Sequence, residues 1–342
     1  MGGGTRVESG QPVTAGDIDA GDILEALSDA RADGSVVLAR GAGRRLPMAG
    51  AGFHVLSTLP LVGVRAYHPE NLTVEVGAGT TAAALNEELS GHGQWFPVGL
   101  LDGDDDTLGG IVSAGLMGSF YGYGPVRDRV LGMTVVTPAF GTVRLGAGVV
   151  KSVAGYNMPR LYWGSRGAFG IITSLILRLS PIPRVPLETV RSGDTTDPRT
   201  LLDVKVREVL DAGWPEARAV VWVDSGRAWL EISAPSDVLR AAGFSSWSRR
   251  APTILPGTIF DRAWGGDRER LGGELDAPLA SGGRAALDVG SGVVHAVTMD
   301  PREPVGPAPL RVGSPLYPVL ARFKAAVDPE GLLLALGEED GA

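Results

Sequence analysis

Short apolar runs that end in glycine turns restrict the fold of this chain more than any other feature. "SVVLARGAG" at residues 35–43 and "LTVEVGAGTT" at residues 72–81 each place an aliphatic run before two glycines. A helical pattern, "TAAALNEELSGHG", follows the second run and stops at Gly91 or Gly93. Strand-like runs that alternate with turns and helices are typical of mixed helix and sheet domains. We expect such a domain in the first half of the chain.

A cluster of prolines divides the sequence into two parts. With 342 residues the chain is long for one hydrophobic core, which suggests two domains. Pro181, Pro183 and Pro186 end the strand pattern of "GIITSLILRLSPIP", so we place the boundary there. The expected divisions are a disordered N-terminus at 1–12, a first domain at 13–183, a smaller domain at 184–318 and a C-terminal helix at 319–342 that returns to the first domain.

The second part carries the signals of a helix followed by a hairpin. "TDPRTLLDVKVREVLDAGWP" has Asp197 as N-cap, Pro198 in the first turn and an apolar face that ends before Gly213, which predicts one helix. "ARAVVWVDSGRAWLEISAP" predicts two strands around "DSGR", with Trp222 and Trp229 on the outer faces. "PVLARFKAAVDPEG" predicts a last helix.

Composition excludes several classes of function. The formal net charge of −8 would repel phosphate backbones, so we expect no nucleic-acid partner. The chain has no cysteine, which removes disulfides, thiolate nucleophiles and iron-sulfur ligation. None of its four histidines stands at metal-ligand spacing, so we expect no metal. No apolar run approaches the ~18 residues of a membrane span, and we expect a cytoplasmic protein.

Three glycine-rich motifs allow more than one interpretation. "GAGTTA" from Gly77 suits a dinucleotide turn, but the acid expected about twenty residues later is missing, and a strand-to-helix turn capped by Thr80 or Thr81 is the better interpretation. "RGAG" at 40–43 allows main-chain N–H groups to converge on an anion. "TLGGIVSAG" at 107–115 allows either close approach of a flat ligand or tight helix packing. The "DGDDD" before it predicts a solvated loop.

Taken in order, these segments resemble a known family. The blocks run from "VVLARGAGRRLPMAG" through "LTVEVGAGTTAAALNEELSGHGQWFPVG" and "TLGGIVSAG" to "YGYGPVRDRVLGMTVVTPAFGTVRLGAGVVKSVAGYNMPRLYWGSRGAFGIITSLILRLSPIP". They resemble the FAD-binding domain of the vanillyl-alcohol oxidase (PCMH) type, and within it the small FAD-binding subunits of bacterial glycolate oxidases. The resemblance implies an α+β fold, a two-lobed FAD-binding domain with a smaller α+β cap domain.

The resemblance also implies a cofactor site. Its residues in this sequence are Arg40, Gly41, Ala42, Gly43, Arg44, Arg45, Gly99, Thr107, Leu108, Gly109, Gly110, Ser113, Ala114, Gly115, Tyr123, Gly124, Arg127, Asp128, Gly170, Ile171 and Ile172. Covalent relatives use a histidine after the first glycine turn or a later cysteine. Because Arg44 follows Gly43 and cysteine is absent, we expect dissociable FAD. Lys151 is a candidate cation near the flavin, and a surface lysine is the competing interpretation.

The implied activity is oxidation of a 2-hydroxy acid, with electrons passed to partners. The expected partners are a larger catalytic FAD subunit and an iron-sulfur subunit, which would hold this chain at the inner membrane. No catalytic base can be named. The cap region has a single histidine, His295, and in the first domain Arg166 stands in place of the usual acidic residue of "GSEGTLG". A stand-alone flavin oxidoreductase of a small hydroxy acid and a scaffold subunit without flavin stay open as alternatives.

Overall fold

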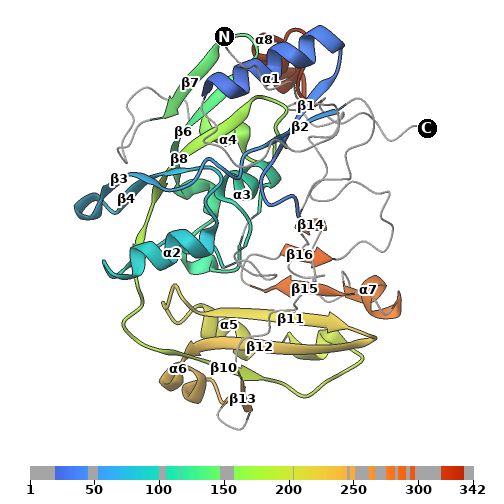
Figure 1. Ribbon diagram of the computed structural model, residues 1–342. Helices are drawn as coiled ribbons and strands as arrows, with labels where there is room; N and C mark the ends of the chain where they lie inside the picture. Colours follow the sequence, from blue (N-terminus) through green and yellow to red (C-terminus); the bar gives the residue numbers. More distant parts are fainter. Residues whose placement is uncertain are drawn as a thin grey trace.

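The computed structural model describes residues 20–44, 53–99, 105–116, 118–146, 158–202, 204–244, 247–250, 262–265, 275–281, 284–289, 293–296 and 317–334. Two sheets organise this part of the chain, one above the other in the view of Figure 1. The first sheet has the antiparallel order β3-β4-β8-β6-β7. Its strands are β3 (Val64–His68), β4 (Thr73–Gly77), β6 (Val130–Thr137), β7 (Gly141–Gly146) and β8 (Ile171–Arg178). The apolar runs of the sequence predict β4 and β8 of this sheet, whereas β3 was not predicted.

Short helices cover this sheet and share its core. They are α2 (Ala82–Ser90), α3 (Leu108–Ala114) and α4 (Pro159–Tyr162). Thr81 caps α2, since its hydroxyl accepts the N–H of Ala84 at 3.1 Å. An added Cβ at Gly77 or Gly79 would lie within 2.2 Å of a carbonyl oxygen of the preceding loop. The "GAGTTA" run is therefore a tightly packed, capped turn between β4 and α2, as the preferred interpretation has it.

A smaller lobe contains the N-terminal strands. Strands β1 (Val36–Arg40) and β2 (Phe53–Ser57) form a parallel pair against helix α1 (Ala20–Asp33). The C-terminal segment joins this lobe, because Val37 donates its N–H to the carbonyl of Leu332 at 2.7 Å. Helix α8 (Tyr317–Val327) precedes that contact and buries Leu320 and Val327 in the core of the first sheet.

The buried Asp328 carboxylate fixes the chain after α8. It accepts the N–H groups of Leu332 and Leu333 at 2.8 and 3.0 Å, and the Lys324 ammonium donates to it. Leu332 and Leu333 then pack in the core of the smaller lobe. This run thus packs the C-terminal segment against the smaller lobe.

The second sheet has seven strands in the order β13-β10-β12-β11-β15-β16-β14. They are β10 (Leu187–Arg191), β11 (Arg218–Asp224), β12 (Arg227–Pro235), β13 (Ser248–Arg250), β14 (Arg262–Gly265), β15 (Ala285–Asp288) and β16 (Val293–Ala296). Helices α5 (Val204–Leu210), α6 (Ser236–Ala241) and α7 (Asp276–Ser281) belong to this domain. One face of the sheet, which includes Val221, Leu230 and Ile232, forms a core with residues of these helices.

The helix predicted as one piece from Asp197 to Gly213 is wrong in extent. A 3-10 turn, η4 (Pro198–Leu201), comes first, and Asp197 caps it by accepting the N–H of Arg199 at 3.0 Å. The backbone leaves helical dihedral angles at Leu202 (φ −94°, ψ 56°) before α5 begins. A segment this short gains little from its own hydrogen bonds, so packing of Leu201 and Leu202 against the sheet decides where it breaks.

The prediction that the hairpin tryptophans lie on outer faces is also wrong. Trp222 and Trp229 are 1% and 8% exposed and pack together with Val220 and Ala286 on the face away from the core helices. Strand β11 pairs with β12 on one side and with β15 on the other, so the hairpin lies inside the sheet. Alternation along a strand distinguishes its two faces but does not show that one of them is solvated.

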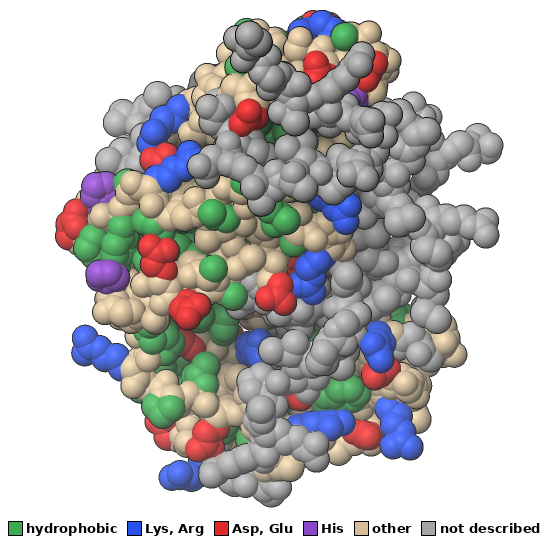
Figure 2. Space-filling model, viewed as in Figure 1, with side chains coloured by type: hydrophobic (Ala, Val, Ile, Leu, Met, Phe, Trp, Pro, Cys, Tyr) green, Lys and Arg blue, Asp and Glu red, His purple; other side chains and the backbone are tan. Residues whose placement is uncertain are grey.

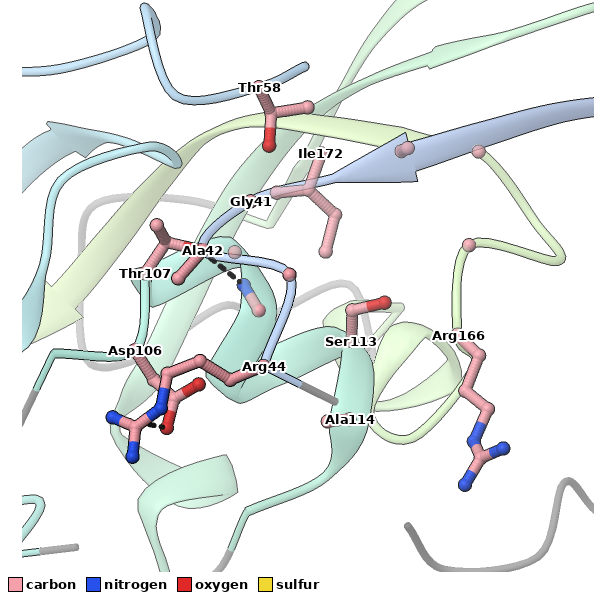
Figure 3. Close-up of a pocket in the computed structure, with 16 residues that line it drawn as sticks. Gly41, Ala42, Arg44, Thr58, Asp106, Thr107, Ser113, Ala114, Arg166 and Ile172 are labelled. Carbon is pink, nitrogen blue, oxygen red and sulfur yellow. Dashed lines mark hydrogen bonds and ion pairs between the residues drawn. The ribbon is translucent and has the colours of Figure 1, made fainter. Parts of the chain in front are cut away.

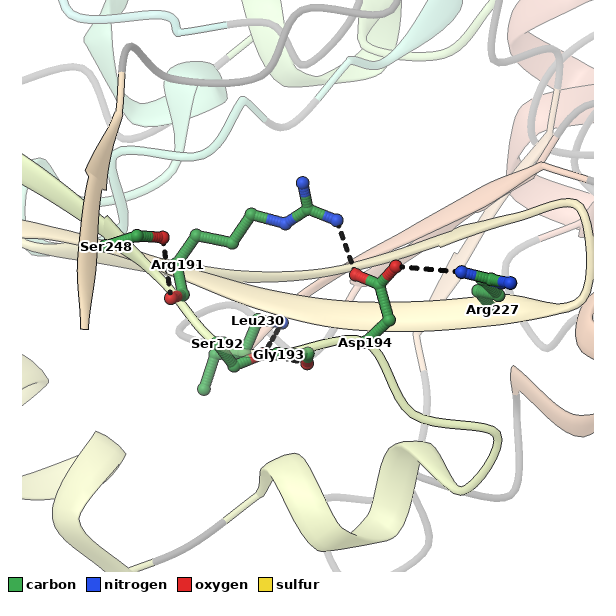
Figure 4. A network of polar contacts seen from close by, with 7 residues as sticks. All are labelled: Arg191, Ser192, Gly193, Asp194, Arg227, Leu230 and Ser248. Carbon is green, nitrogen blue, oxygen red and sulfur yellow. Dashed lines mark hydrogen bonds and ion pairs between the residues drawn. The ribbon is translucent and has the colours of Figure 1, made fainter.

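A network of polar contacts that includes Arg191, Asp194 and Arg227 lies at the edge of this tryptophan face, as Figure 4 shows. The Arg191 guanidinium lies 4.4 Å from the Trp229 ring centroid, and Asp194 accepts from it at 2.6 Å. Asp194 also pairs with Arg227 at 3.5 Å. The Trp222 indole donates to Glu231 Oε2 at 3.2 Å. Charged groups on this face are therefore oriented by direct contacts.

Direct contacts also join the two domains. The Tyr123 hydroxyl donates to Glu216 Oε1 at 2.6 Å, and Arg218 donates to Ser119 Oγ at 3.4 Å. Burial, followed by the Glu216 contact, raises the pKa of Tyr123. Because Arg218 shares its face of β11 with Trp222, the tryptophan face adjoins the first domain.

The described surface mixes charges of both signs. In Figure 2, acidic and basic side chains alternate over the visible face instead of separating by sign. Among the described helices, none combines the length and hydropathy that crossing a bilayer requires.

Candidate functional site

A pocket opens where the end of β1, helix α3 and the loop before β8 meet (Figure 3). Main chain and small side chains form most of its wall. The lining residues are Ala39, Gly41, Ala42, Gly43, Arg44, Thr58, Asp106, Thr107, Gly109, Gly110, Ser113, Ala114, Arg166, Gly167, Gly170 and Ile172. Two glycine-rich motifs that lie more than sixty residues apart in the sequence, "RGAG" and "TLGGIVSAG", thus meet at one site.

The turn after β1 supplies hydrogen-bond donors to this pocket. In the described part of the chain, the N–H groups of Gly41, Ala42 and Gly43 have no hydrogen-bond partner. Gly43 has a φ of +72°, and an added Cβ there would lie 2.3 Å from the Arg40 guanidinium. Successive main-chain N–H groups in such a turn form a concave site for an anion. The donor chemistry of this turn fits a phosphate or pyrophosphate.

Helix α3 contributes a flush floor but few donors. The N–H groups of Leu108 and Gly109 already donate to the carbonyls of Thr80 and Ala78, each at 2.8 Å. The N–H of Gly110 donates to the Thr107 hydroxyl at 3.2 Å, so the side chain of the N-cap residue occupies a third N–H group of α3. The start of α3 therefore does not offer the anion site that its sequence suggests.

The tight-packing interpretation of "TLGGIVSAG" holds at Gly109, and other residues of the run line the pocket. An added Cβ at Gly109 would lie 3.0 Å from the Cβ of Ala78, so this glycine permits tight packing of α3 on the turn before α2. Gly110, Ser113 and Ala114 line the pocket with little side-chain volume. A flat ligand can approach that surface closely.

The prediction of a solvated loop before α3 is wrong for one aspartate. Asp105 is exposed, whereas Asp106 is only 4% exposed and lies 3.8 Å from the Arg44 guanidinium. The carbonyl of Asp106 accepts the N–H of Ala82 at 3.3 Å, which fixes the residue beside the start of α2. The pair links the β1 turn to the entrance of α3. Residues 101–104 lie outside the described part.

Arg166 lines the pocket from the loop before β8, and Figure 3 draws it on the other side of Ser113 and Ala114 from Arg44. Its φ of +52° lies in the left-handed region, which non-glycine residues seldom adopt. Its N–H donates to the carbonyl of Ser113 at 2.9 Å, and burial lowers the pKa of its guanidinium. The sequence showed Arg166 only as a departure from "GSEGTLG". The sequence signal that could have placed Arg166 at the pocket is its position shortly before the strand that starts at Ile171.

The other predicted site residues divide between pocket, core and surface. Eleven of them line the pocket: Gly41, Ala42, Gly43, Arg44, Thr107, Gly109, Gly110, Ser113, Ala114, Gly170 and Ile172. Leu108 and Ile171 point into hydrophobic cores, and Gly99 packs against Phe120. Asp128 pairs with the exposed Arg160 at 2.6 Å.

Five more predicted residues that the structure describes do not line the pocket. Arg40 lies beneath Gly43, Gly115 contacts Gly164, and Tyr123 bonds to Glu216. Gly124 and Arg127 lie with Tyr123, away from the pocket lining. Arg45 lies outside the described residues, as does the candidate cation Lys151. Ala39, Thr58, Asp106, Arg166 and Gly167 line the pocket without having been predicted.

Comparison with known proteins defines the class of this site. Residues 18–146 match a family described as "FAD binding domain". This part of the chain is an FAD-binding domain, and its cofactor is FAD. The matched range contains the β1 turn and α3, whereas Arg166 and Gly170 of the pocket lie beyond it.

Similar proteins include hydroxy acid oxidoreductases. The chain is 36% identical over 131 residues to glycolate oxidase subunit GlcE of Escherichia coli, a match that covers 38% of this chain and 37% of that protein. It is 38% identical over 122 residues to a mitochondrial D-lactate dehydrogenase (cytochrome) of Arabidopsis thaliana, which covers 35% of this chain and 21% of that protein. Glycolate oxidase subunit GlcD of Bacillus subtilis is 31% identical over 148 residues, 42% of this chain and 31% of that protein. The matches therefore span about a fifth to two fifths of these relatives.

Solved structures agree on the fold over a longer range. The structure of an alkyldihydroxyacetonephosphate synthase superposes with a TM-score of 0.61 at 16% identity, covering 92% of this chain and 74% of that one. The likeness includes the second sheet as well as the first, and it supports the expected α+β architecture.

The pocket fits part of an FAD molecule by its donor chemistry. Gly41, Ala42 and Gly43 offer N–H groups for the pyrophosphate, and Arg44 adds a positive charge beside them. The floor at Gly110 and Ala114 leaves room for a flat or extended group. Neither histidine nor cysteine occurs among the lining residues, so the described pocket contains no side chain that would attach a flavin covalently.

Proposed function

We propose that this chain is the FAD-binding subunit of a glycolate-oxidase-type 2-hydroxy acid dehydrogenase complex and holds its FAD noncovalently. The observation that carries the proposal is the main-chain pocket between the β1 turn and α3, where three N–H groups at one wall have no partner among the described residues. Similarity to both GlcE and GlcD supports the hydroxy acid class of substrate.

The roles of the residues follow from the pocket. The N–H groups of Gly41–Gly43 would bind the pyrophosphate, and Arg44, oriented by Asp106, would add charge. Thr107 and the small residues of α3 would exclude water beneath the cofactor while allowing its close approach. When bound, FAD supplies the two-electron acceptor for hydride from the carbon that carries the hydroxyl.

The proposed partners are a larger catalytic FAD subunit and an iron-sulfur subunit. Similarity to two different glycolate oxidase subunits supports an assembly of several chains. This chain has no cysteine with which to bind an iron-sulfur cluster, so such a centre would belong to another subunit. We place the complex on the cytoplasmic side, at the inner membrane through its partners.

Absorbance and precipitation of the purified chain test the cofactor. Bands near ~450 nm are expected, because they belong to oxidised flavin and not to any side chain. After acid precipitation the flavin should remain in the supernatant. Flavin in the pellet would contradict noncovalent binding, and a chain that binds no added FAD would support the scaffold alternative.

Reconstitution tests the partners. Co-expression with the larger flavoprotein and the cysteine-rich subunit that we expect to be encoded in neighbouring reading frames should give a complex that oxidises glycolate or D-lactate with an artificial acceptor. The isolated chain should show no such turnover. Turnover by the isolated chain would instead favour a stand-alone oxidoreductase.

One feature of the second sheet favours that alternative. Glu231 and Asp288 are 4% and 0% exposed, and both are register partners of Val220 on the tryptophan face. Glu231 is also the register partner of Arg191, so a carboxylate that could act as a base lies beside a cation that could bind a substrate carboxylate. If the isolated chain is active, Glu231→Gln should lower kcat without changing FAD content, whereas unchanged kcat would remove this residue from the mechanism.

A further inference from the structure

Arg166 is a charged residue of the pocket that has no assigned role so far. It replaces the acid of the "GSEGTLG" motif, and it lies outside the β1 turn. The charged residues of the described lining are Arg44, Arg166 and Asp106. The described lining thus holds two arginines and one aspartate, and its formal charge is positive. Fixed positive charge in a partly desolvated pocket favours an anionic ligand.

The backbone around Arg166 is fixed to the floor of the pocket. The N–H groups of Gly164 and Arg166 donate to the carbonyls of Val112 and Ser113, both at 2.9 Å. An added Cβ at Gly115 would lie 3.1 Å from the Cα of Gly164, so the loop and α3 are in close contact. Arg166 is therefore held at a defined position relative to the residues beneath the cofactor.

The conformation of Arg166 supports a role for its side chain. At a φ of +52° glycine or asparagine would be less strained, and Gly164, Gly167 and Gly170 in the same loop all have positive φ. An arginine retained at such a position, with its side chain along the pocket wall, suggests a function for the guanidinium.

We propose that Arg166 binds an anionic group of the bound FAD. The inference rests on the proposed FAD site and adds a second cationic contact to that of Arg44. FAD offers two groups of this chemistry, the pyrophosphate and the isoalloxazine ring once it is reduced. Either gains from a charge-assisted hydrogen bond, and a cation near the ring favours its reduced anionic form.

Ligand titrations of the purified full-length apoprotein test the proposal. The variants are Arg166→Gln, which removes the charge, Arg166→Lys, which keeps it, and Arg160→Gln as the matched control. Arg160 is an exposed arginine of the preceding helix that does not line the pocket. FAD, ADP and riboflavin are the probes, and the midpoint potential of the bound flavin is measured for each variant.

Two results would support the proposal and distinguish the groups. If Arg166 contacts the pyrophosphate, Arg166→Gln should weaken FAD and ADP about ten- to a hundredfold and leave riboflavin unchanged. If Arg166 contacts the reduced ring, Arg166→Gln should leave ADP binding unchanged. The variant should weaken the binding of reduced FAD at least tenfold more than the binding of oxidised FAD, each compared with the wild type. A tenfold difference lowers the two-electron midpoint potential by about 30 mV. Arg166→Lys should recover part of either effect.

Wild-type affinities and potential in Arg166→Gln, equal to those of the Arg160→Gln control, would overturn the proposal. An altered thermal midpoint of the apoprotein with unchanged ligand affinities would do the same, because it would show a purely structural role. If the wild-type chain binds no FAD at all, the proposed FAD-binding function is refuted. If the wild type binds FAD and Arg166→Gln binds it equally well, only the proposed role of Arg166 is refuted.

Discussion

The Thr107 hydroxyl lies between two glycines, and this arrangement gives a quantitative prediction. An added Cβ at Gly41 would lie 2.2 Å from Thr107 Oγ1 and 3.3 Å from both Thr107 Cβ and Cγ2. The φ of Gly41 is not positive, so alanine meets no dihedral strain there. The same hydroxyl accepts the Gly110 N–H at 3.2 Å and caps α3. Gly41→Ala should therefore act through contact with Thr107.

The magnitudes follow from that geometry. Gly41→Ala should cost about 1–3 kcal/mol of unfolding free energy, as overpacking does. Thr107→Ala should cost about 1 kcal/mol through loss of the cap. In the Thr107→Ala background the 2.2 Å contact is removed and the Cβ at position 107 lies 3.3 Å away, a distance that a shift of a few tenths of an ångström relieves. The double variant should thus be more stable than the sum of single costs predicts, by about 1–2 kcal/mol.

Urea unfolding of the four proteins measures this coupling, and FAD titration of the same samples shows whether affinity follows. Gly91→Ala is the control, because an added Cβ there meets nothing within 4 Å and its φ is −62°. It should change stability little. Equal costs of Gly41→Ala in the two backgrounds would refute the proposed contact between the β1 turn and the cap of α3.

Four further changes test other parts of the structure. Gly110→Val should abolish retention of FAD and leave the second domain folded, since Gly110 lines the pocket and a Cβ there would occupy the surface that the ligand approaches; normal FAD content would contradict this. Asp106→Asn should tighten ADP binding about fivefold, because one negative charge leaves the pocket, and weaker binding would show that its main role is to orient the pocket. Burial raises the pKa of Tyr162 to about 12 from 10.0, so stability is complete below about pH 10 and falls as pH rises toward 12, by about 2–3 kcal/mol; Tyr162→Phe should reduce this loss in alkaline unfolding curves. Tyr123→Phe should lower the thermal midpoint by removing a donor from buried Glu216, at about 1–3 kcal/mol, and an unchanged midpoint would argue against a stabilising contact between domains.

Much of the first domain could be predicted because its signals are local. The runs around Val76 and Leu175 become strands of one sheet, and Thr81 caps α2 at the predicted turn. The glycine of the β1 turn, Gly43, has the positive φ that its position requires. Each of these properties depends on a residue and its near neighbours in the sequence, so the pattern is sufficient.

The second domain was harder to predict for the opposite reason. The burial of Trp222 and Trp229 depends on β15 pairing beside β11, more than fifty residues further along the chain. The break between η4 and α5 depends on what Leu201 and Leu202 contact. The local sequence pattern shows neither which strand will pair with β11 nor which surface Leu201 and Leu202 will contact.

By itself, the sequence determined that two runs, "RGAG" and "TLGGIVSAG", consist of glycine and small side chains that let another group approach the backbone. Only the tertiary structure decided which groups line that site. The N–H groups of Leu108 and Gly109 bind carbonyls of another turn, whereas those of the β1 turn stay available within the described part of the chain. Asp106 becomes buried beside Arg44, and Arg166 reaches the same pocket from a later loop. These contacts join segments that are distant in sequence, and their energies depend on burial and distance, which arise only when the chain folds.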